Sequence, residues 1–142
     1  MKMKICGITN VEDGLAAAQA GADLLGFIFH PKSPRYVSVE QAQAIMATVR
    51  RRFRPHAPQG VGVFVNTPPA RVQYVLYTAG LTYAQLHGDE GADEVAALRG
   101  RAYKALRPKT LDEALAAAER FGGLGPQAGP SLLVDAFHPA EY

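Results

Sequence analysis

The chain has 142 residues, the size of one ordinary domain, and is long enough to close a hydrophobic core. Apolar residues make up 48% and charged residues 20% of it, which is typical of a folded globular protein and excludes a disordered or collagen-like chain. The net charge of +2 is too small to predict a nucleic-acid partner. The arginines at 50–52 and 54 fall where a helix should end, and the helix dipole, which favours cations there, explains them better than a binding patch does.

Short apolar runs alternate along the chain with longer segments of helical period. The strand-like runs are residues 1–6, 23–29, 60–65, 82–87, 102–107 and 131–137, and the helical segments are 11–21, 39–53, 69–79, 90–99 and 111–121. Each helical segment follows a residue that can cap free N–H groups, namely Asn10, Ser38, Thr67, Asp89 and Thr110. In the first helix, Leu15, Ala18 and residues 21–22 have the spacing of a buried stripe.

Apolar strands separated by single helices pair in parallel through right-handed crossovers, so the expected class is α/β in one domain over residues 1–142. The strand-to-strand steps average about 26 residues, close to the unit of a TIM (β/α)8 barrel. A barrel would hold about six βα units here and lack two. An open doubly wound sheet explains the length as it stands, and length alone favours it.

Polar or reactive residues stand at the carboxyl end of every predicted strand: Cys6, the segment 29–37, Asn66, His87, Arg107 and Asp135. Barrels and open sheets both place their sites at this edge. A carboxylate in an apolar run such as the one around Asp135 is costly unless it is hydrogen-bonded or functional. Free cysteines are most often small buried hydrophobes, so composition alone favours an inert Cys6. His87 and Asn66 equally fit structural roles.

Five stretches in order resemble one family: KICGIT (4–9), GADLLGFIFHPKSPRYV (21–37), GVFVN (62–66), QLHGDE (85–90) and LLVDA (132–136). They resemble phosphoribosylanthranilate isomerase of tryptophan biosynthesis. The resemblance implies a TIM (β/α)8-type barrel, of which about six βα units are present. It also implies late loops and a short helix that hold the substrate phosphate. This sequence shows no counterpart of them, so we expect it to be the N-terminal portion of a longer chain.

The resemblance implies Cys6 as general base and Asp135 as general acid. Arg35 matches the arginine that engages the anthranilate part of the substrate, and a guanidinium suits a carboxylate. Gln85 and His87 match positions that line the pocket. Lys4 precedes Cys6 by two residues, so both side chains should face one side of the strand, where cations would favour the thiolate.

The implied reaction is the Amadori rearrangement of N-(5-phosphoribosyl)anthranilate to 1-(2-carboxyphenylamino)-1-deoxyribulose 5-phosphate. This aldose–ketose isomerisation, an intramolecular oxidoreduction, needs one acid and one base and no metal, nucleotide or redox cofactor. The expected partner is therefore a phosphosugar substrate, with no nucleic acid and no membrane. Whether the protein is a monomer or a homodimer stays open.

The single cysteine cannot form an internal disulfide, and the first residues are strand-like with no leader, so we expect a reducing compartment, the cytoplasm. No apolar run is long enough to span a bilayer.

Two alternatives remain. One is a non-catalytic partial barrel whose first and sixth strands expose edges prone to association. The other is a different sugar-phosphate isomerase on the same fold, such as the related histidine-pathway enzyme. That enzyme uses a pair of aspartates, so Cys6 argues against it.

Overall fold

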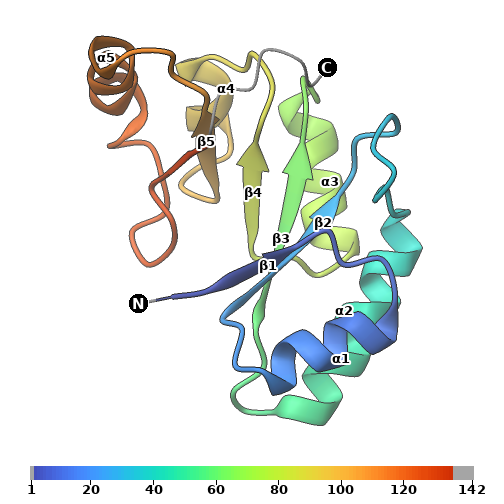
Figure 1. Cartoon of the computed structure of the whole chain (residues 1–142). Helices are drawn as coiled ribbons and strands as arrows, with labels where there is room; N and C mark the ends of the chain where they lie inside the picture. The colour runs from blue at the N-terminus through green and yellow to red at the C-terminus, as the bar shows by residue number, and fades with distance from the viewer. Residues whose placement is uncertain (1, 136–142) are drawn as a thin grey trace.

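The computed structural model describes residues 2–135, which form a curved parallel sheet of six strands with helices on its outer face (Figure 1). The elements alternate as predicted: β1 (Lys4–Cys6), α1 (Val11–Gln19), β2 (Leu24–Ile28), α2 (Val39–Phe53), β3 (Gln59–Phe64), α3 (Pro69–Thr78), β4 (Tyr83–Leu86), α4 (Ala92–Ala97), β5 (Ala102–Leu106), α5 (Leu111–Phe121) and β6 (Leu132–Val134). Residue 1 and residues 136 and 137, at the ends of two predicted strands, lie outside the described part.

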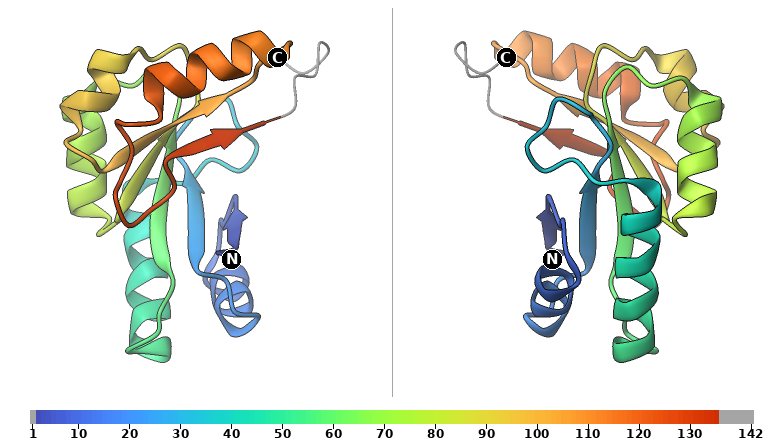
Figure 2. Two further views of the ribbon diagram at one scale, coloured as in Figure 1. Left: turned by 90° about the vertical axis from the view of Figure 1, so that its left-hand side faces the viewer. Right: turned by 90° about the vertical axis from the view of Figure 1, so that its right-hand side faces the viewer.

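The strands pair in chain order from β1 to β6, every pair parallel. A doubly wound sheet would reverse its order at a switch point, whereas a barrel adds each strand beside the previous one. The fold is therefore of the TIM-barrel type, and the open doubly wound sheet that length alone favoured is excluded. Figure 2 shows the curvature, with β1 (dark blue) and β6 (red) as the two edges and helices α2, α3 and α4 outside the sheet.

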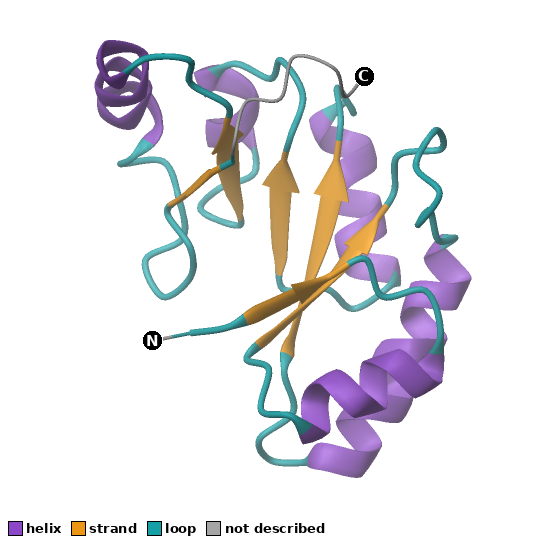
Figure 3. Ribbon diagram, in the orientation of Figure 1, coloured by secondary structure: helices purple, strands orange, loops and turns teal. Residues whose placement is uncertain are grey.

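Two apolar clusters lie on opposite faces of the sheet. Helices cover the outer face of the sheet (Figure 3). The larger cluster packs this face against the helices and includes Leu25, Phe27, Phe64 and Leu86. The smaller one lies on the inner face and comprises Leu24, Val61, Tyr83 and Tyr103, with Leu133 packed against it. Side chains alternate between the faces with a period of two residues, so strands buried on both faces are apolar nearly throughout.

Three of the five predicted helix caps are confirmed, and two are not. Asn10 and Thr110 accept hydrogen bonds from backbone N–H groups of their first turns, and Ser38 forms a capping box with Gln41. The prediction of Asp89 as a cap is wrong, because α4 begins at Ala92 behind Gly91. Asp89 instead bonds to Asn66 in the neighbouring loop. Thr67 is not the cap of α3 either, since Pro68 occupies that position without a side-chain hydrogen bond.

The buried stripe of α1 lies one position away from the prediction. Gly14 and Ala17 are its buried residues, while Leu15 and Ala18 are only partly buried against the core. A Cβ atom at Gly14 would lie 2.9 Å from Ile45 Cγ2, so the glycine lets α1 approach α2 closely. Arg50 to Arg52 form the last turn of α2, as their charge predicted.

Within residues 2–135, none of the helices combines the length and the apolar character needed to cross a membrane.

Candidate active site

Cys6 is the last residue of β1 and its side chain is exposed. The expectation that composition alone gives, a buried cysteine, is therefore wrong. Gly26 is its register partner on β2, and a Cβ atom there would lie 2.7 Å from the Cys6 sulfur. The glycine leaves room for the thiol. Gly7 follows with a φ of 87°, a conformation that glycine adopts without strain, and turns the chain out of the strand.

Arg35 lies against the backbone that follows Cys6. The loop after β2 folds back on itself, since the Val37 N–H donates to the Ile28 carbonyl at 3.0 Å. This return brings Arg35 Nη1 to 3.4 Å from the Cys6 carbonyl oxygen. A Cβ atom at Gly7 would lie 2.7 Å from the same Nη1, so the guanidinium packs where a larger residue would stand. The structure thus brings a cation beside the cysteine.

His87 and Asp135 meet at the other side of the site. His87 Nε2 lies 3.4 Å from Asp135 Oδ2, and the side chains are 23% and 49% exposed. The Asp135 N–H donates to the Leu106 carbonyl at 2.8 Å, which fixes its backbone beside β5. Asp135 was expected to be embedded in an apolar strand, but it is half exposed just after the edge strand β6, so a large burial cost does not apply.

The surroundings of His87 disfavour the imidazolium ion. Burial lowers the pKa of His87 below 6.5, and the positive charges of Arg107, Lys104 and Lys4 lower it further. The charge of Asp135 acts in the opposite direction. Because the lowering effects outweigh that of Asp135, the fold favours the neutral imidazole.

A chain of polar contacts crosses the inner face of the sheet beneath these residues. Lys4 Nζ donates to Gln85 Oε1, and the Tyr103 hydroxyl lies 3.1 Å from the same oxygen. Gln85 Nε2 lies 3.2 Å from His87 Nδ1. Gln85 is only 3% exposed, so both ends of its amide are used by protein groups. Burial lowers the pKa of Lys4, an effect that the nearby Cys6 charge partly offsets.

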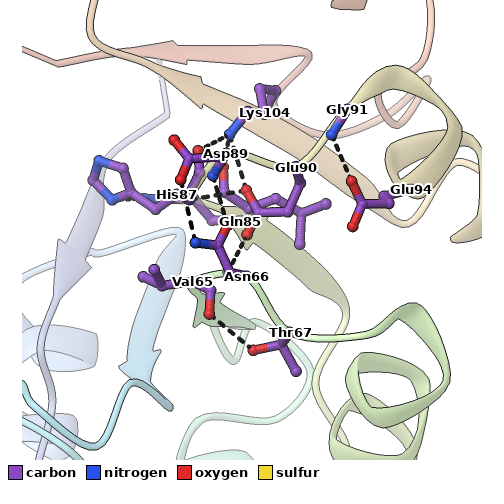
Figure 4. A network of polar contacts seen from close by, with 12 residues as sticks. Val65, Asn66, Thr67, Gln85, His87, Asp89, Glu90, Gly91, Glu94 and Lys104 are labelled. Carbon is purple, nitrogen blue, oxygen red and sulfur yellow. Dashed lines mark hydrogen bonds and ion pairs between the residues drawn. The ribbon is translucent and has the colours of Figure 1, made fainter.

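A second network ties together the loops after β3 and β4 (Figure 4). Lys104 Nζ lies 2.9 Å from Glu90 Oε2, with the two side chains 6% and 1% exposed. The Glu90 carboxylate also accepts the N–H groups of Asn66 at 2.7 Å and Gly88 at 2.8 Å. Lys104 donates to the Gly88 carbonyl at 2.5 Å. Asn66 anchors its loop, as one reading of the sequence allowed, through Asp89.

Three residues of these networks, Glu90, Lys104 and Tyr103, are not among the predicted site residues. The available signal was the run AYKAL, because a lysine within a buried strand requires a partner. Its partner stands 14 residues earlier in a loop, a separation that no local pattern connects.

A cavity of about 340 Å³ opens on the inner face, lined by Lys2, Lys4, Leu24, Tyr103, Leu132 and Leu133 among others. It lies toward the amino ends of the strands, away from Cys6 and Asp135, so it is not the candidate site. Among residues 2–135, no group of three His, Cys, Asp or Glu side chains is arranged to hold a metal ion.

The comparisons with known proteins point to one family. A family model described as N-(5'phosphoribosyl)anthranilate (PRA) isomerase matches residues 3–123. An N-(5'-phosphoribosyl)anthranilate isomerase of Rubrobacter xylanophilus is 46% identical over 144 aligned positions, which cover 99% of this chain and 65% of that protein. The chain thus spans a little under two thirds of the length of this curated relative, and about half the length of one from Geobacter sulfurreducens, at 52%.

Solved structures agree. Phosphoribosylanthranilate isomerase of Thermotoga maritima superimposes with a TM-score of 0.83 at 34% identity, covering 99% of this chain and 64% of that one. A structure of such an isomerase in complex with reduced 1-(o-carboxyphenylamino)-1-deoxyribulose 5-phosphate gives a TM-score of 0.81 at 34% identity, covering 96% of this chain and 66% of that one. With the family model matched over most of its length, this chain belongs to the N-(5'-phosphoribosyl)anthranilate isomerase family.

Proposed function

We propose that this chain carries the acid–base pair of phosphoribosylanthranilate isomerisation, with Cys6 as general base and Asp135 as general acid. The observation that carries the proposal is the exposed thiol at the carboxyl end of β1 with Arg35 beside it, in a chain of this family. Asp135 follows β6, also at the carboxyl ends of the strands, and contacts His87. Because β1 and β6 are the two edge strands, a substrate held between them can meet one group on each side.

The acid acts first. Asp135, protonated, gives its proton to the furanose ring oxygen as the bond from that oxygen to the sugar C1 breaks. The electron pair of the anthranilate nitrogen forms the new C–N double bond, which gives a cationic Schiff base. The half-exposed position of Asp135 lets the carboxyl group reach a substrate. This step leaves a carboxylate on the protein.

The base acts second. The Cys6 thiolate removes the proton from the sugar C2, and the electrons of that C–H bond neutralise the Schiff base to an enolamine. The enolamine then tautomerises to the ketone. Lys4 lies close enough for its charge to interact with that of Cys6, and Arg35 lies against the Cys6 backbone. The thiolate is the reactive form of cysteine in this step.

The substrate-binding roles fall to Arg35 and His87, while Gln85, which the resemblance also placed in the pocket, is buried and supports His87. Among the described residues, the Arg35 guanidinium donates a hydrogen bond only to the Cys6 carbonyl, so most of its donors are available to a substrate carboxylate. His87 lies beside the acid, and Gln85 holds His87 from below. We infer that the protein works in the cytoplasm on this phosphosugar as part of tryptophan biosynthesis.

The test is turnover of N-(5-phosphoribosyl)anthranilate by this chain, followed through the optical change of the anthranilate group. Cys6→Ala and Asp135→Asn should each lower kcat by about 10²- to 10⁴-fold, the usual contribution of a general acid or base. Asp112→Asn, the same change as Asp135→Asn but on the exposed α5, is the control and should leave kcat unchanged. Near-normal turnover by Cys6→Ala would refute the assignment of the base.

The open edges of the sheet favour a second candidate, a non-catalytic module that associates through them. Ile5 on β1 is 38% exposed and Val134 on β6 is 67% exposed, so both edges present apolar side chains. Sedimentation of the same chain separates the two candidates. A chain that self-associates and gives no turnover supports the module, and turnover by a single copy excludes it.

A further inference from the structure

The polar contacts on the inner face join residues of β1, β4 and β5 to the residues that follow β4 and β6. Lys4 on β1 and Tyr103 on β5 meet Gln85 on β4, Gln85 meets His87, and His87 meets Asp135 after β6. Heavy-atom positions alone do not say which atom of an amide is oxygen or which imidazole nitrogen carries the proton. Lys4 and Tyr103, whose donor groups are known, decide both questions.

The orientation of Gln85 follows from Lys4. An ammonium group has three donors and no acceptor, so the Gln85 atom that faces it must be the amide oxygen. The Tyr103 hydroxyl donates to the same oxygen at 3.1 Å. Burial raises the pKa of Tyr103, and the charge of Cys6 raises it further, so the phenol keeps the proton that it donates. The Gln85 nitrogen is therefore the atom that lies 3.2 Å from His87.

The protonation of His87 follows from Gln85. An amide nitrogen is only a donor, so His87 Nδ1 must be the acceptor and cannot carry a proton. A neutral imidazole has one N–H, which is then at Nε2, the atom 3.4 Å from Asp135 Oδ2. Nε2 is buried and makes no hydrogen bond within the described residues. Long contacts of this kind in active sites tighten when the substrate binds.

The charged groups around His87 agree with a neutral ring. The charges of Lys4 on β1, of Lys104 on β5 and of Arg107 just after β5 all oppose a positive charge on the imidazole. Among residues 2–135, the charge of Asp135, just after β6, is the one that favours it. The Gln85 N–H group occupies the lone pair of His87 Nδ1, to which a second proton would have to bind.

We propose that Lys4, Tyr103 and Gln85 fix His87 as the neutral Nε2–H tautomer and that this N–H positions the carboxyl group of Asp135. The consequence for catalysis rests on the proposed function of Asp135 as the acid. When the contact tightens in the substrate complex and Nε2–H donates to Oδ2, the acidic proton belongs on Oδ1. An imidazolium would instead hold Asp135 as a carboxylate, which has no proton to give. His87 and Gln85 are thus positioning residues for the acid.

The test is the ¹⁵N spectrum of the imidazole rings, in which long-range couplings separate protonated from unprotonated nitrogens. The His87 signals are identified by their loss in His87→Gln. In the unaltered chain at pH 7, we expect Nε2 in the protonated range and Nδ1 in the unprotonated range, with the Nε2–H form in excess by about tenfold. A Nδ1–H form or an equal mixture would overturn the proposal.

Three variants test what sets the tautomer. Gln85→Glu places an acceptor at Nδ1, so His87 should gain a proton there, either as the other tautomer or as the imidazolium. Lys4→Met frees the amide to turn over, and the excess of the Nε2–H form should fall toward equality. Asp135→Ala should keep the Nε2–H form. A shift in Asp135→Ala without one in Gln85→Glu would show that Asp135 sets the tautomer and would overturn the proposal.

Gln43→Glu, the same change on an exposed face of α2, is the matched control and should leave the His87 signals in place. If a variant does not fold, the spectrum of the unaltered chain alone decides whether the Nε2–H form exists. The measurement needs no substrate. A chain without turnover but with the Nε2–H form therefore contradicts the proposed function while supporting the tautomer.

Discussion

Replacing Lys104 by methionine removes one partner of the buried ion pair beneath the loops after β3 and β4. Methionine has a similar length and fills the space of the lysine stem, so the change acts mainly on charge. Glu90 is left 1% exposed with two backbone N–H donors and no counter-ion. Removing one partner of such a pair costs about 3–5 kcal/mol, because the remaining charge stays buried without compensation.

That loss is large beside the total stability of a domain, about 5–15 kcal/mol. Urea unfolding followed by circular dichroism measures it directly. Lys32→Met, the same substitution in an exposed loop, is the control and should change the free energy of unfolding by no more than about 0.5 kcal/mol.

The double variant Lys104→Met with Glu90→Gln sharpens the test, since it removes both charges. We expect it to be less destabilised than the sum of the single variants by about 1–3 kcal/mol. Amide exchange should also quicken at Asn66 and Gly88, whose N–H groups bond to Glu90. A loss below about 1 kcal/mol in Lys104→Met, or simple additivity in the double variant, would refute the reasoning.

Two further predictions follow from the site. Gly26→Ala places a Cβ atom 2.7 Å from the Cys6 sulfur, so we expect the free energy of unfolding to fall by about 1–3 kcal/mol. The rate of thiol modification should also change, and it reports on Cys6 alone because the chain has one cysteine. Gly123→Ala, where a Cβ atom meets no other atom within 4 Å, is the control and should change neither quantity; equal effects would contradict the expected crowding. The pKa of His87 is lowered in the folded protein, so as the pH falls below 6.5 His87 binds a proton more readily in the unfolded state than in the folded state. The free energy of unfolding therefore decreases as the pH falls through this range. The unaltered chain should therefore lose more stability between about pH 7 and pH 5 than His87→Gln does; equal slopes would show that His87 is not the group responsible.

The order of elements was predictable from local pattern. Alternating apolar runs and capped helical segments gave all six strands and five helices, because burial on both faces and the need for parallel crossovers leave a clear period in the sequence. Because the strands are parallel, the same pattern predicted that Cys6, His87 and Asp135 lie together at the carboxyl ends of the strands. The boundaries of α4 were less predictable, since the residue that looked like its cap bonds elsewhere.

The sequence by itself therefore determined the α/β class, the repeat of the units and the edge where polar side chains gather, since each depends on residues close in the chain. The resemblance in the sequence predicted a barrel, and the tertiary structure confirmed the barrel order of the strands. Only the tertiary structure decided that Cys6 is exposed and that Glu90 neutralises Lys104. It also decided the orientation of Gln85, through Lys4, 81 residues away in the chain. Such contacts depend on which side chains the curved sheet brings together, and no local period records them.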